Sequence, residues 1–359
     1  MPETPPAAIL AAWGLEAATV TPAAGGHINR SWLVAPGRYL LQRINPIVFP
    51  DGWQVLENVA HVSAHLEAAA LAEEMDPERR VLRLRRTEQG EPGVRGEDGA
   101  CWRLLHFIEG AVGVEQVTSP DQGEFAGAAF GLFQRLVSTY DGPPLVETIP
   151  GFHDTRRRLE QLERAAHRDV ARRAGEVPNE LRFASRRAQY AGVLPPLIAS
   201  GEVPGRIVHN DAKIANVLFD AATGAPLAVV DLDTVMPGTL LSDVGDLIRS
   251  SATTAAEDER DPARVVLWPE VIEQLLAGFL REAGSGLTDA EREHLIFAGI
   301  LLTYEQGVRF LTDYLEGDRY YRVTRPAQNI ERVRAQFRLV ECLEEARSTL
   351  ERRVKAIGA

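Results

Sequence analysis

The hydrophobic pattern of this chain changes its period near residue 108, and this change limits the possible folds more than any other feature. Before that point, short apolar runs alternate with turn residues, which is typical of antiparallel strands. One stretch, 53–70, has helical spacing instead and contains no internal Gly or Pro. We therefore predict a small β-rich N-terminal lobe at residues 1–108 with one long helix. The segments with strand character are 17–22, 29–35, 38–45, 81–86 and 100–108.

Most of the remaining chain has the apolar spacing of helices. The segment 206–230 differs, because its short apolar triplets are separated by polar loops, a pattern that favours short strands supporting a loop-built site. The sequence therefore predicts an α/β (α+β) fold of two lobes, with a larger, mostly helical C-terminal lobe at residues 109–359. The expected helices are 122–140, 154–172, 180–198, 269–283, 289–315 and 327–354.

Composition and charge exclude several classes of protein. The chain has 359 residues, of which 45% are hydrophobic and 25% charged, and these values suit a soluble enzyme with a sizeable core. A net charge of -12 provides no bulk attraction to nucleic acid or to an anionic membrane, so we expect neither as a partner. Cys101 and Cys342 are far apart and outside any CxxC or Cys/His cluster, which argues against a disulfide framework or a zinc site. The N-terminal residues lack the pattern of a secretory signal, and we expect a cytoplasmic protein.

The sharpest motif is HNDAKIAN at 209–216, followed by Asp231 in the segment VVDLD. Phosphoryl transfer needs a carboxylate that accepts the proton of the attacking hydroxyl or orients that hydroxyl, and Asp211 would supply it. It also needs an amide oxygen and a second carboxylate to hold magnesium ions on the nucleotide phosphates, here Asn216 and Asp231. The alternative is an ordinary Asn/Asp turn between two strands with a surface carboxylate.

These motifs resemble the protein-kinase-like superfamily, and more closely its aminoglycoside phosphotransferase and choline kinase branch. The similarity extends through 238–246, where that branch carries a Gly and an Asp that opens a helix. The resemblance implies a two-lobed protein-kinase-like fold with ATP and Mg²⁺ as cofactors. It implies that Asp211 is the catalytic base, that Asn216 and Asp231 are magnesium ligands, and that Asp243 braces the catalytic loop.

Lys213 follows the expected base by two residues, as in protein kinases, where a lysine at this place touches the transferred phosphate. The resemblance therefore adds Lys213 to Asp211 as a catalytic residue. A solvated loop lysine explains the same position equally well, so both interpretations stay open.

The N-terminal lobe offers a glycine turn and a basic strand end. Gly25 and Gly26 lie between two expected strands and would let the backbone approach nucleotide phosphates, although a plain hairpin turn explains them equally well. Kinases place a lysine at the end of the third strand, paired with a glutamate of the next helix. Here the position falls on Arg43, whose guanidinium can hold phosphate oxygens, and Glu57 is the expected partner.

The resemblance also places a nucleotide contact after the last strand of this lobe. The strand at 102–109 would lead into the hinge between the lobes, and the backbone near Phe107 and Glu109 would meet adenine. These two residues complete the expected ATP-binding set.

Two further segments, 151–155 and 303–321, look like the N-acetylhexosamine 1-kinases, and the similarity covers about residues 20 to 345. It implies a sugar acceptor. The alternative is that Glu305 and Arg309 form a plain i,i+4 ion pair and that the tyrosines cap a helix end. The residues expected to bind the sugar are Arg309, Tyr320, Tyr321, Tyr304 and His27.

The chain is therefore expected to be a monomeric kinase that uses ATP and magnesium to phosphorylate the anomeric hydroxyl of N-acetylglucosamine or N-acetylgalactosamine, giving the sugar 1-phosphate. A rival expectation is another small-molecule kinase of the same fold, acting on an aminoglycoside, an amino alcohol or another sugar. A nucleotide-binding pseudokinase is a further alternative, and the presence of Asp211, Asn216 and Asp231 argues against it.

Overall fold

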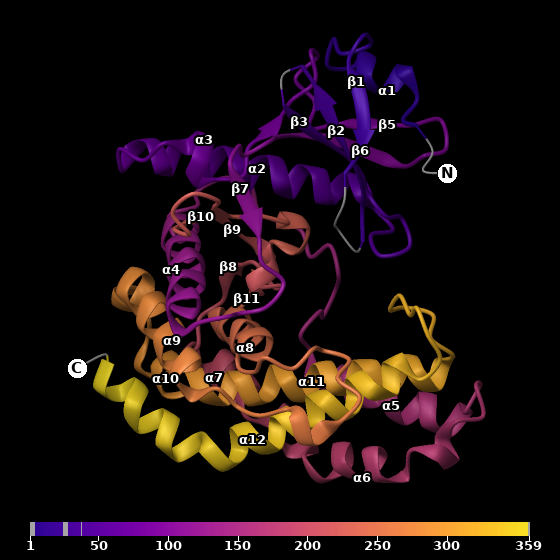
Figure 1. The fold of residues 1–359 in the computed structure, drawn as a ribbon, viewed down its shortest axis with the longest axis vertical. Helices are drawn as coiled ribbons and strands as arrows, with labels where there is room; N and C mark the ends of the chain where they lie inside the picture. Colours follow the sequence, from indigo (N-terminus) through magenta and orange to yellow (C-terminus); the bar gives the residue numbers. More distant parts are fainter. Residues whose placement is uncertain (1–3, 24–27, 37, 358–359) are drawn as a thin grey trace. The chain divides into compact units, whose positions relative to one another are not determined.

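The computed structural model describes residues 4–23, 28–36 and 38–357, and the chain divides into two compact units (Figure 1). Neither unit is one continuous segment. Residue 108, where the sequence predicted one boundary, lies near the end of the first segment of the first unit, and later parts of the chain also belong to that unit. The first unit comprises Met1–Gly113, Leu136–Pro150 and Val217–Pro237, and the second comprises Val114–Arg135, Gly151–Asn216 and Gly238–Ala359.

An antiparallel six-stranded sheet forms the main part of the first unit. Its strand order is β1-β2-β3-β6-β4, and β5 pairs with β6. This confirms the predicted β-rich lobe and its one long helix. The elements of this part of the chain are α1 (Ala7–Ala11), β1 (Thr19–Pro22), β2 (Arg30–Ala35), β3 (Tyr39–Arg43), α2 (Gly52–Ala72), α3 (Pro77–Arg80), β4 (Leu84–Arg85), β5 (Val94–Arg95), β6 (Cys101–His106) and β7 (Ala111–Gly113).

The two faces of this sheet carry different groups because side chains alternate along each strand. One face packs against α1 and buries an aromatic and aliphatic cluster. The long helix α2 packs against β4 and β6 and begins at Asp51, whose carboxylate accepts from the N–H groups of Trp53 and Gln54 at 3.1 and 3.4 Å. The cluster on the α1 face contains Ile9, Leu10, Trp13, Trp32, Val34, Leu41, Trp102 and Leu104.

A second sheet, with strand order β10-β9-β7, explains why residues 217–237 belong to the first unit. Its members β9 (Val217–Asp220) and β10 (Pro226–Val229) were expected, whereas the three-residue strand β7 was too short to show a period. The sheet leads into the 3-10 turn η4 (Leu232–Thr234), which α2 also contacts.

The second unit is mostly helical, as predicted. Its two longest helices, α11 and α12, pack along each other (Figure 1), and α11 also contacts α5 and α8. None of the helices in the described part of the chain is long and apolar enough to cross a membrane. The remaining elements of the chain, of which α4 and β11 each have residues in both units, are α4 (Pro120–Val137), α5 (Thr155–Arg168), η1 (Ala174–Glu176), α6 (Pro178–Arg186), η2 (Ala188–Gly192), α7 (Leu194–Ser200), β8 (Arg206–Val208), η3 (Ile214–Asn216), β11 (Met236–Gly238), α8 (Leu240–Ser251), η5 (Pro262–Arg264), α9 (Pro269–Ala283), η6 (Gly284–Gly286), α10 (Asp289–Glu293), α11 (Leu295–Glu316) and α12 (Gln328–Ile357).

The single helix expected at 180–198 is wrong. The chain forms α6, then the 3-10 segment η2, then α7. Pro195 and Pro196 explain why a separate helix begins here, because they stand in the first turn of α7, where a missing N–H is tolerated, whereas inside one continuous helix they would leave two hydrogen bonds unmade.

Helix α4 supports the loop that follows β8. Phe130 and Phe133 place their rings edge-on to the His209 ring, and the Gln134 side chain donates to the carbonyl of Ile207 at 3.2 Å. Helix α4 also crosses α9 at close range, and glycines of both helices lie at the crossing. A Cβ atom at Gly127 would overlap the carbonyl oxygen of Leu275.

This crossing gives a stability prediction. Gly127→Ala should lower the free energy of unfolding by about 1 to 3 kcal/mol, because the added methyl group forces two packed backbones apart. Gly192→Ala is the matched control, since a Cβ there would meet nothing within 4 Å. Urea unfolding of both variants measures the difference, and a Gly127→Ala protein as stable as the control would contradict the close crossing.

Candidate active site

The loop after β8 is fixed by a buried carboxylate. Asp243, in the first turn of α8, accepts from the N–H groups of His209 and Asn210 at 2.8 and 2.7 Å. Asn210 has a φ of 62°, a left-handed conformation that needs such support in a residue other than glycine. The expected bracing of the loop by Asp243 is therefore confirmed.

This loop brings three of the expected residues together. The Lys213 ammonium lies 2.8 Å from Oδ2 of Asp211. The Asn216 side-chain nitrogen donates to the carbonyl oxygen of Asp211 at 2.8 Å and to its Oδ2 at 3.2 Å. Because its nitrogen is used in this way, the amide oxygen of Asn216 is the atom that can serve as a metal ligand.

Asp211 is strongly acidic. Burial alone would raise its pKa, but the charge and hydrogen bond of Lys213 outweigh burial and hold the pKa at about 2. The carboxylate is therefore ionised at neutral pH. Such a group orients a hydroxyl by accepting its hydrogen bond and takes the proton only when that hydroxyl has become acidic in the transition state.

His153 links the helix α11 to this loop. Its Nδ1 lies 2.9 Å from Oε1 of Glu305 and its Nε2 lies 2.9 Å from the carbonyl oxygen of Asn210. Both partners can only accept, so both ring nitrogens carry hydrogen and the ring is an imidazolium. The second oxygen of Glu305 accepts from the Thr155 hydroxyl at 2.6 Å.

The Arg309 guanidinium lies between aromatic rings. It is 4.8 Å from the centre of the Phe152 ring and 5.9 Å from that of Tyr321, and it donates to Gln306 at 3.2 Å. The alternative ion pair with Glu305 is not formed, because both oxygens of that carboxylate are held by His153 and Thr155. Among the residues that the structure describes, no carboxylate lies within ion-pair distance of Arg309.

Two of the expected tyrosines lie on a loop that one carboxylate organises. Asp313 accepts from the N–H groups of Arg319, Tyr320 and Tyr321 at 2.8, 2.7 and 3.0 Å. The Tyr321 hydroxyl receives a hydrogen bond from Gln306, the residue that also contacts Arg309. Tyr321 therefore lies beside Arg309, whereas the Tyr320 side chain is 51% exposed.

Tyr304, which was expected to bind the sugar, lies in the helical core. Its side chain is fully buried, its hydroxyl donates to the carbonyl of Ala184 at 2.6 Å, and its ring contacts that of Tyr190. Residue 304 faces the helical core because it lies on a different side of α11 from Arg309. The expected roles of Gly25, Gly26 and His27 concern residues outside the described part of the chain.

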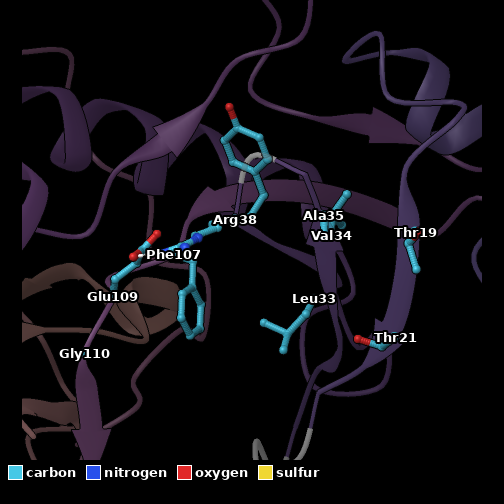
Figure 2. Close-up of a pocket in the computed structure, with 10 residues that line it drawn as sticks. Thr19, Thr21, Leu33, Val34, Ala35, Arg38, Phe107, Glu109 and Gly110 are labelled. Atoms are coloured by element: carbon cyan, nitrogen blue, oxygen red, sulfur yellow. Dashed lines mark ion pairs between the residues drawn. The ribbon is translucent and has the colours of Figure 1, made fainter.

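The first unit contains a pocket of about 390 Å³ lined mainly by residues of its sheet (Figure 2). Leu33 of β2 and Phe107 approach it from two sides, and both side chains are partly exposed, at 38% and 43%. Arg38 and Glu109 form an ion pair at its rim. The expected adenine contacts Phe107 and Glu109 therefore line one apolar pocket. The other lining residues are Thr19, Thr21, Val34, Ala35, Tyr39 and Gly110.

Arg43 does not take the place of the strand-three lysine. It pairs with Asp98 at 2.7 Å, while the exposed carboxylate of Glu57 accepts from the Trp53 indole at 3.2 Å. The expected Arg43 to Glu57 pair is therefore not formed. The reason is strand alternation, because Arg43 shares the face of Leu41 and the α1 cluster, opposite the face that carries Leu33 and the pocket.

Asp231 and Asp233 lie in the first unit and differ in their surroundings. Asp231 is half-buried and has a φ of 63°. Asp233 is 4% exposed and pairs through one oxygen with Arg103 and through the other with the Asn29 amide, at 2.6 Å. Both oxygens of Asp233 are engaged inside its unit, so Asp233 is unsuited to binding a metal ion.

Sequence reasoning missed three residues of these networks, Arg103, Gln42 and His153. Arg103 had a visible signal, since it is a charged residue inside the apolar strand CWRLLH. His153 lies in the segment 151–155 singled out by its resemblance, but no role was assigned to it there. Gln42 had no signal, because its partner Arg103 lies far away in sequence.

The imidazolium of His153 gives a pH prediction. Burial alone would lower its pKa, but the hydrogen bonds to Glu305 and to the carbonyl of Asn210 outweigh burial and raise it above 6.5. A raised folded-state pKa stabilises the protein fully below the unfolded pKa, and this stabilisation is lost as pH rises through the folded pKa. The difference in unfolding free energy between wild type and His153→Gln should therefore shrink as the pH rises above the ordinary pKa of a histidine. Thermal or urea unfolding measures it, His167→Gln on α5 is the control, and a difference that grows with pH would contradict the assignment.

Comparison with known proteins places this arrangement in a family. The profile of the phosphotransferase enzyme family, APH, matches residues 19–294. An aminoglycoside phosphotransferase from Alicyclobacillus acidocaldarius has a similar fold, with a TM-score of 0.61 and 16% identity over 98% of each chain. A choline kinase from Cryptosporidium parvum superimposes with a TM-score of 0.58 and 11% identity, again over 98% of each chain.

A third similar structure is the amicoumacin kinase hAmiN in complex with AMP-PNP, Ca²⁺ and Ami, with a TM-score of 0.57 and 15% identity over 91% of this chain and 88% of that one. These structures share the kinase-like fold of the present chain. The family match covers more than half of the sequence and contains the HNDAKIAN loop and Asp231. The chain therefore belongs to the phosphotransferase enzyme family, as a small-molecule phosphotransferase with the kinase-like fold.

Proposed function

We propose that this protein transfers the γ-phosphate of ATP to the anomeric hydroxyl of an N-acetylhexosamine, with magnesium, and releases the sugar 1-phosphate. The observation that carries the phosphoryl-transfer part is the braced loop on which Lys213 and Asn216 both contact Asp211. The observation that favours a neutral sugar is the Arg309 guanidinium, held between aromatic rings without a carboxylate partner in the described structure.

Each unit, taken by itself, contains groups that suit a nucleotide. The first contains an apolar pocket that suits the base and the Asp231 carboxylate, and the second contains the amide oxygen of Asn216. Carboxylate and amide oxygens are ligands that suit Mg²⁺, which usually keeps other positions for water and phosphate oxygens. The bound ion would neutralise charge on the β- and γ-phosphates.

Asp211 and Lys213 act on the acceptor and the transferred group in this proposal. The ionised Asp211 orients the anomeric hydroxyl and receives its proton as the bond to phosphorus forms. Lys213 keeps Asp211 ionised and supplies a positive charge for the phosphoryl oxygens. The contact between the two side chains favours this role of Lys213 over a solvated loop position.

Arg309 and Tyr321 suit a sugar acceptor. A guanidinium offers fixed donors to hydroxyl and amide oxygens, and a tyrosine ring covers an apolar sugar face. A cationic acceptor, such as an aminoglycoside or an amino alcohol, would need carboxylates instead. Glu305, four residues before Arg309, is already engaged by His153 and Thr155.

The direct test is a coupled assay of ADP release across free N-acetylhexosamines, other hexoses, choline and aminoglycosides. We expect the highest kcat/KM for N-acetylglucosamine or N-acetylgalactosamine. A higher kcat/KM for an aminoglycoside or for choline would contradict the proposed sugar acceptor and favour a cationic one. A protein that binds ATP but releases no ADP with any of these acceptors would favour the pseudokinase alternative.

Asp211→Asn should lower turnover by about two to four decades while ATP affinity and melting temperature change little, because only the group that receives the proton is lost. Asp289→Asn, an exposed change on α10, is the matched control. Single-turnover kinetics and calorimetric ATP titration measure the two properties. Residual turnover above about a tenth of wild type would remove the base role from Asp211.

Arg309→Ala should lower kcat/KM for the sugar by the equivalent of about 1 to 3 kcal/mol, because a desolvated sugar oxygen loses its donor. ATP binding should stay close to wild type. Arg347→Ala on α12 is the control, since that arginine forms an exposed i,i+4 pair with Glu351. An unchanged KM for sugar in a folded Arg309→Ala protein would exclude Arg309 from the acceptor site.

A further inference from the structure

The buried arginine of β6 lies on the same sheet face as the pocket. Arg103 pairs across strands with Gln42, and Gln42 pairs with Ser31 of β2. Ser31 is two residues before Leu33, which lines the pocket, so both point to one face. A buried cation on the pocket side of this sheet therefore comes from β6, while β3 contributes the neutral Gln42 at the paired position.

All three nitrogens of the Arg103 guanidinium contact an oxygen of a neighbouring side chain. Its Nε and Nη2 donate to Oε1 of Gln42 at 2.9 and 2.7 Å, and its Nη1 pairs with Oδ1 of Asp233. The residue is 1% exposed. A guanidinium buried to this degree is retained only with a matching anion and acceptor, because an unpaired buried charge is very unfavourable.

Asp233 connects this cation to a chain segment of unusual backbone. It lies in η4, directly after Asp231, whose φ of 63° places a residue other than glycine in the left-handed region. Such a conformation persists when neighbouring contacts fix it. The second oxygen of Asp233 accepts from Asn29, and the carbonyl of Val235 accepts from Asn58 of α2 at 3.2 Å.

We propose that Arg103 is a positioning residue for metal binding: through Asp233 it fixes the backbone of the Asp231 segment and so orients the Asp231 carboxylate. This inference rests on the proposed role of Asp231 as a magnesium ligand. Arg103 itself touches neither metal nor nucleotide. Its contacts with Gln42 and Asp233 restrict the orientation of the Asp231 carboxylate, because hydrogen-bonded neighbours of a metal ligand generally fix its orientation.

The test compares ATP binding with and without magnesium, which needs neither acceptor nor turnover. Calorimetric titration gives the Kd of ATP in MgCl₂ and in EDTA for wild type, Arg103→Gln and Arg103→Lys. We expect Arg103→Gln to raise the Kd in MgCl₂ by about 10- to 100-fold, the usual effect of losing a residue that orients a metal ligand. The Kd in EDTA should stay close to wild type, and Arg103→Lys should recover part of the loss because it keeps the charge.

Two further variants distinguish positioning from a general structural effect. Asp233→Asn should reproduce the loss, and the double variant Arg103→Gln with Asp233→Asn should be little worse than either change alone, since both remove one contact. Arg95→Gln, an exposed change on β5, is the control. If Arg103→Gln does not fold, Arg103→Lys and Asp233→Asn still give the same measurement.

The outcomes separate this proposal from the proposed function. Wild type that binds ATP equally well with and without magnesium would contradict the metal role of Asp231 and hence the proposed function. Magnesium-dependent binding that survives in a folded Arg103→Gln or Asp233→Asn protein would overturn the positioning role alone. If Arg43→Gln weakened magnesium-dependent ATP binding and Arg103→Gln did not, the positioning role would belong to Arg43 on the opposite sheet face and not to Arg103.

Discussion

The candidate site depends first on the buried carboxylate of Asp243. It stands in the first turn of α8 and receives two consecutive backbone N–H groups, those of His209 and Asn210. Burial raises its pKa above the ordinary value, and the helix dipole together with these donors offsets part of that cost. This contact fixes the loop backbone, so the position of Asp211 follows from the packing of helix α8.

Buried cations then join chain segments that lie far apart in sequence. His153 connects Glu305 of α11 with the carbonyl of Asn210, and Arg103 connects Gln42 of β3 with Asp233 of η4. In each case one positive group satisfies acceptors from two segments, which holds those segments in a single arrangement. Each unit therefore contains one buried cation that joins two chain segments. In the second unit it lies beside the loop that carries Asp211, and in the first it lies beside the segment that carries Asp231.

Part of the site could be predicted because its chemistry is local in sequence. The spacing within HNDAKIAN places Asp211, Lys213 and Asn216 on one short loop, and the structure brings these three together. Arg43 could not be assigned correctly, because one residue along a strand reverses the face and nothing local showed which face was open. Tyr304 was likewise assigned from its neighbourhood in sequence, although a helix turns adjacent residues to different sides.

The sequence by itself determined the fold class, the alternation of the strands, most helices and the identity of the phosphoryl-transfer loop, because each depends on periodicity or on residues a few positions apart. Only the tertiary structure decided which sheet face carries the pocket, that Glu305 serves His153 rather than Arg309, and that Arg103 rather than Arg43 is the buried cation of the sheet. The physical reason is that ion pairs and hydrogen bonds in the interior are chosen by proximity after packing. Sequence spacing does not specify that proximity for residues more than one helix or strand apart.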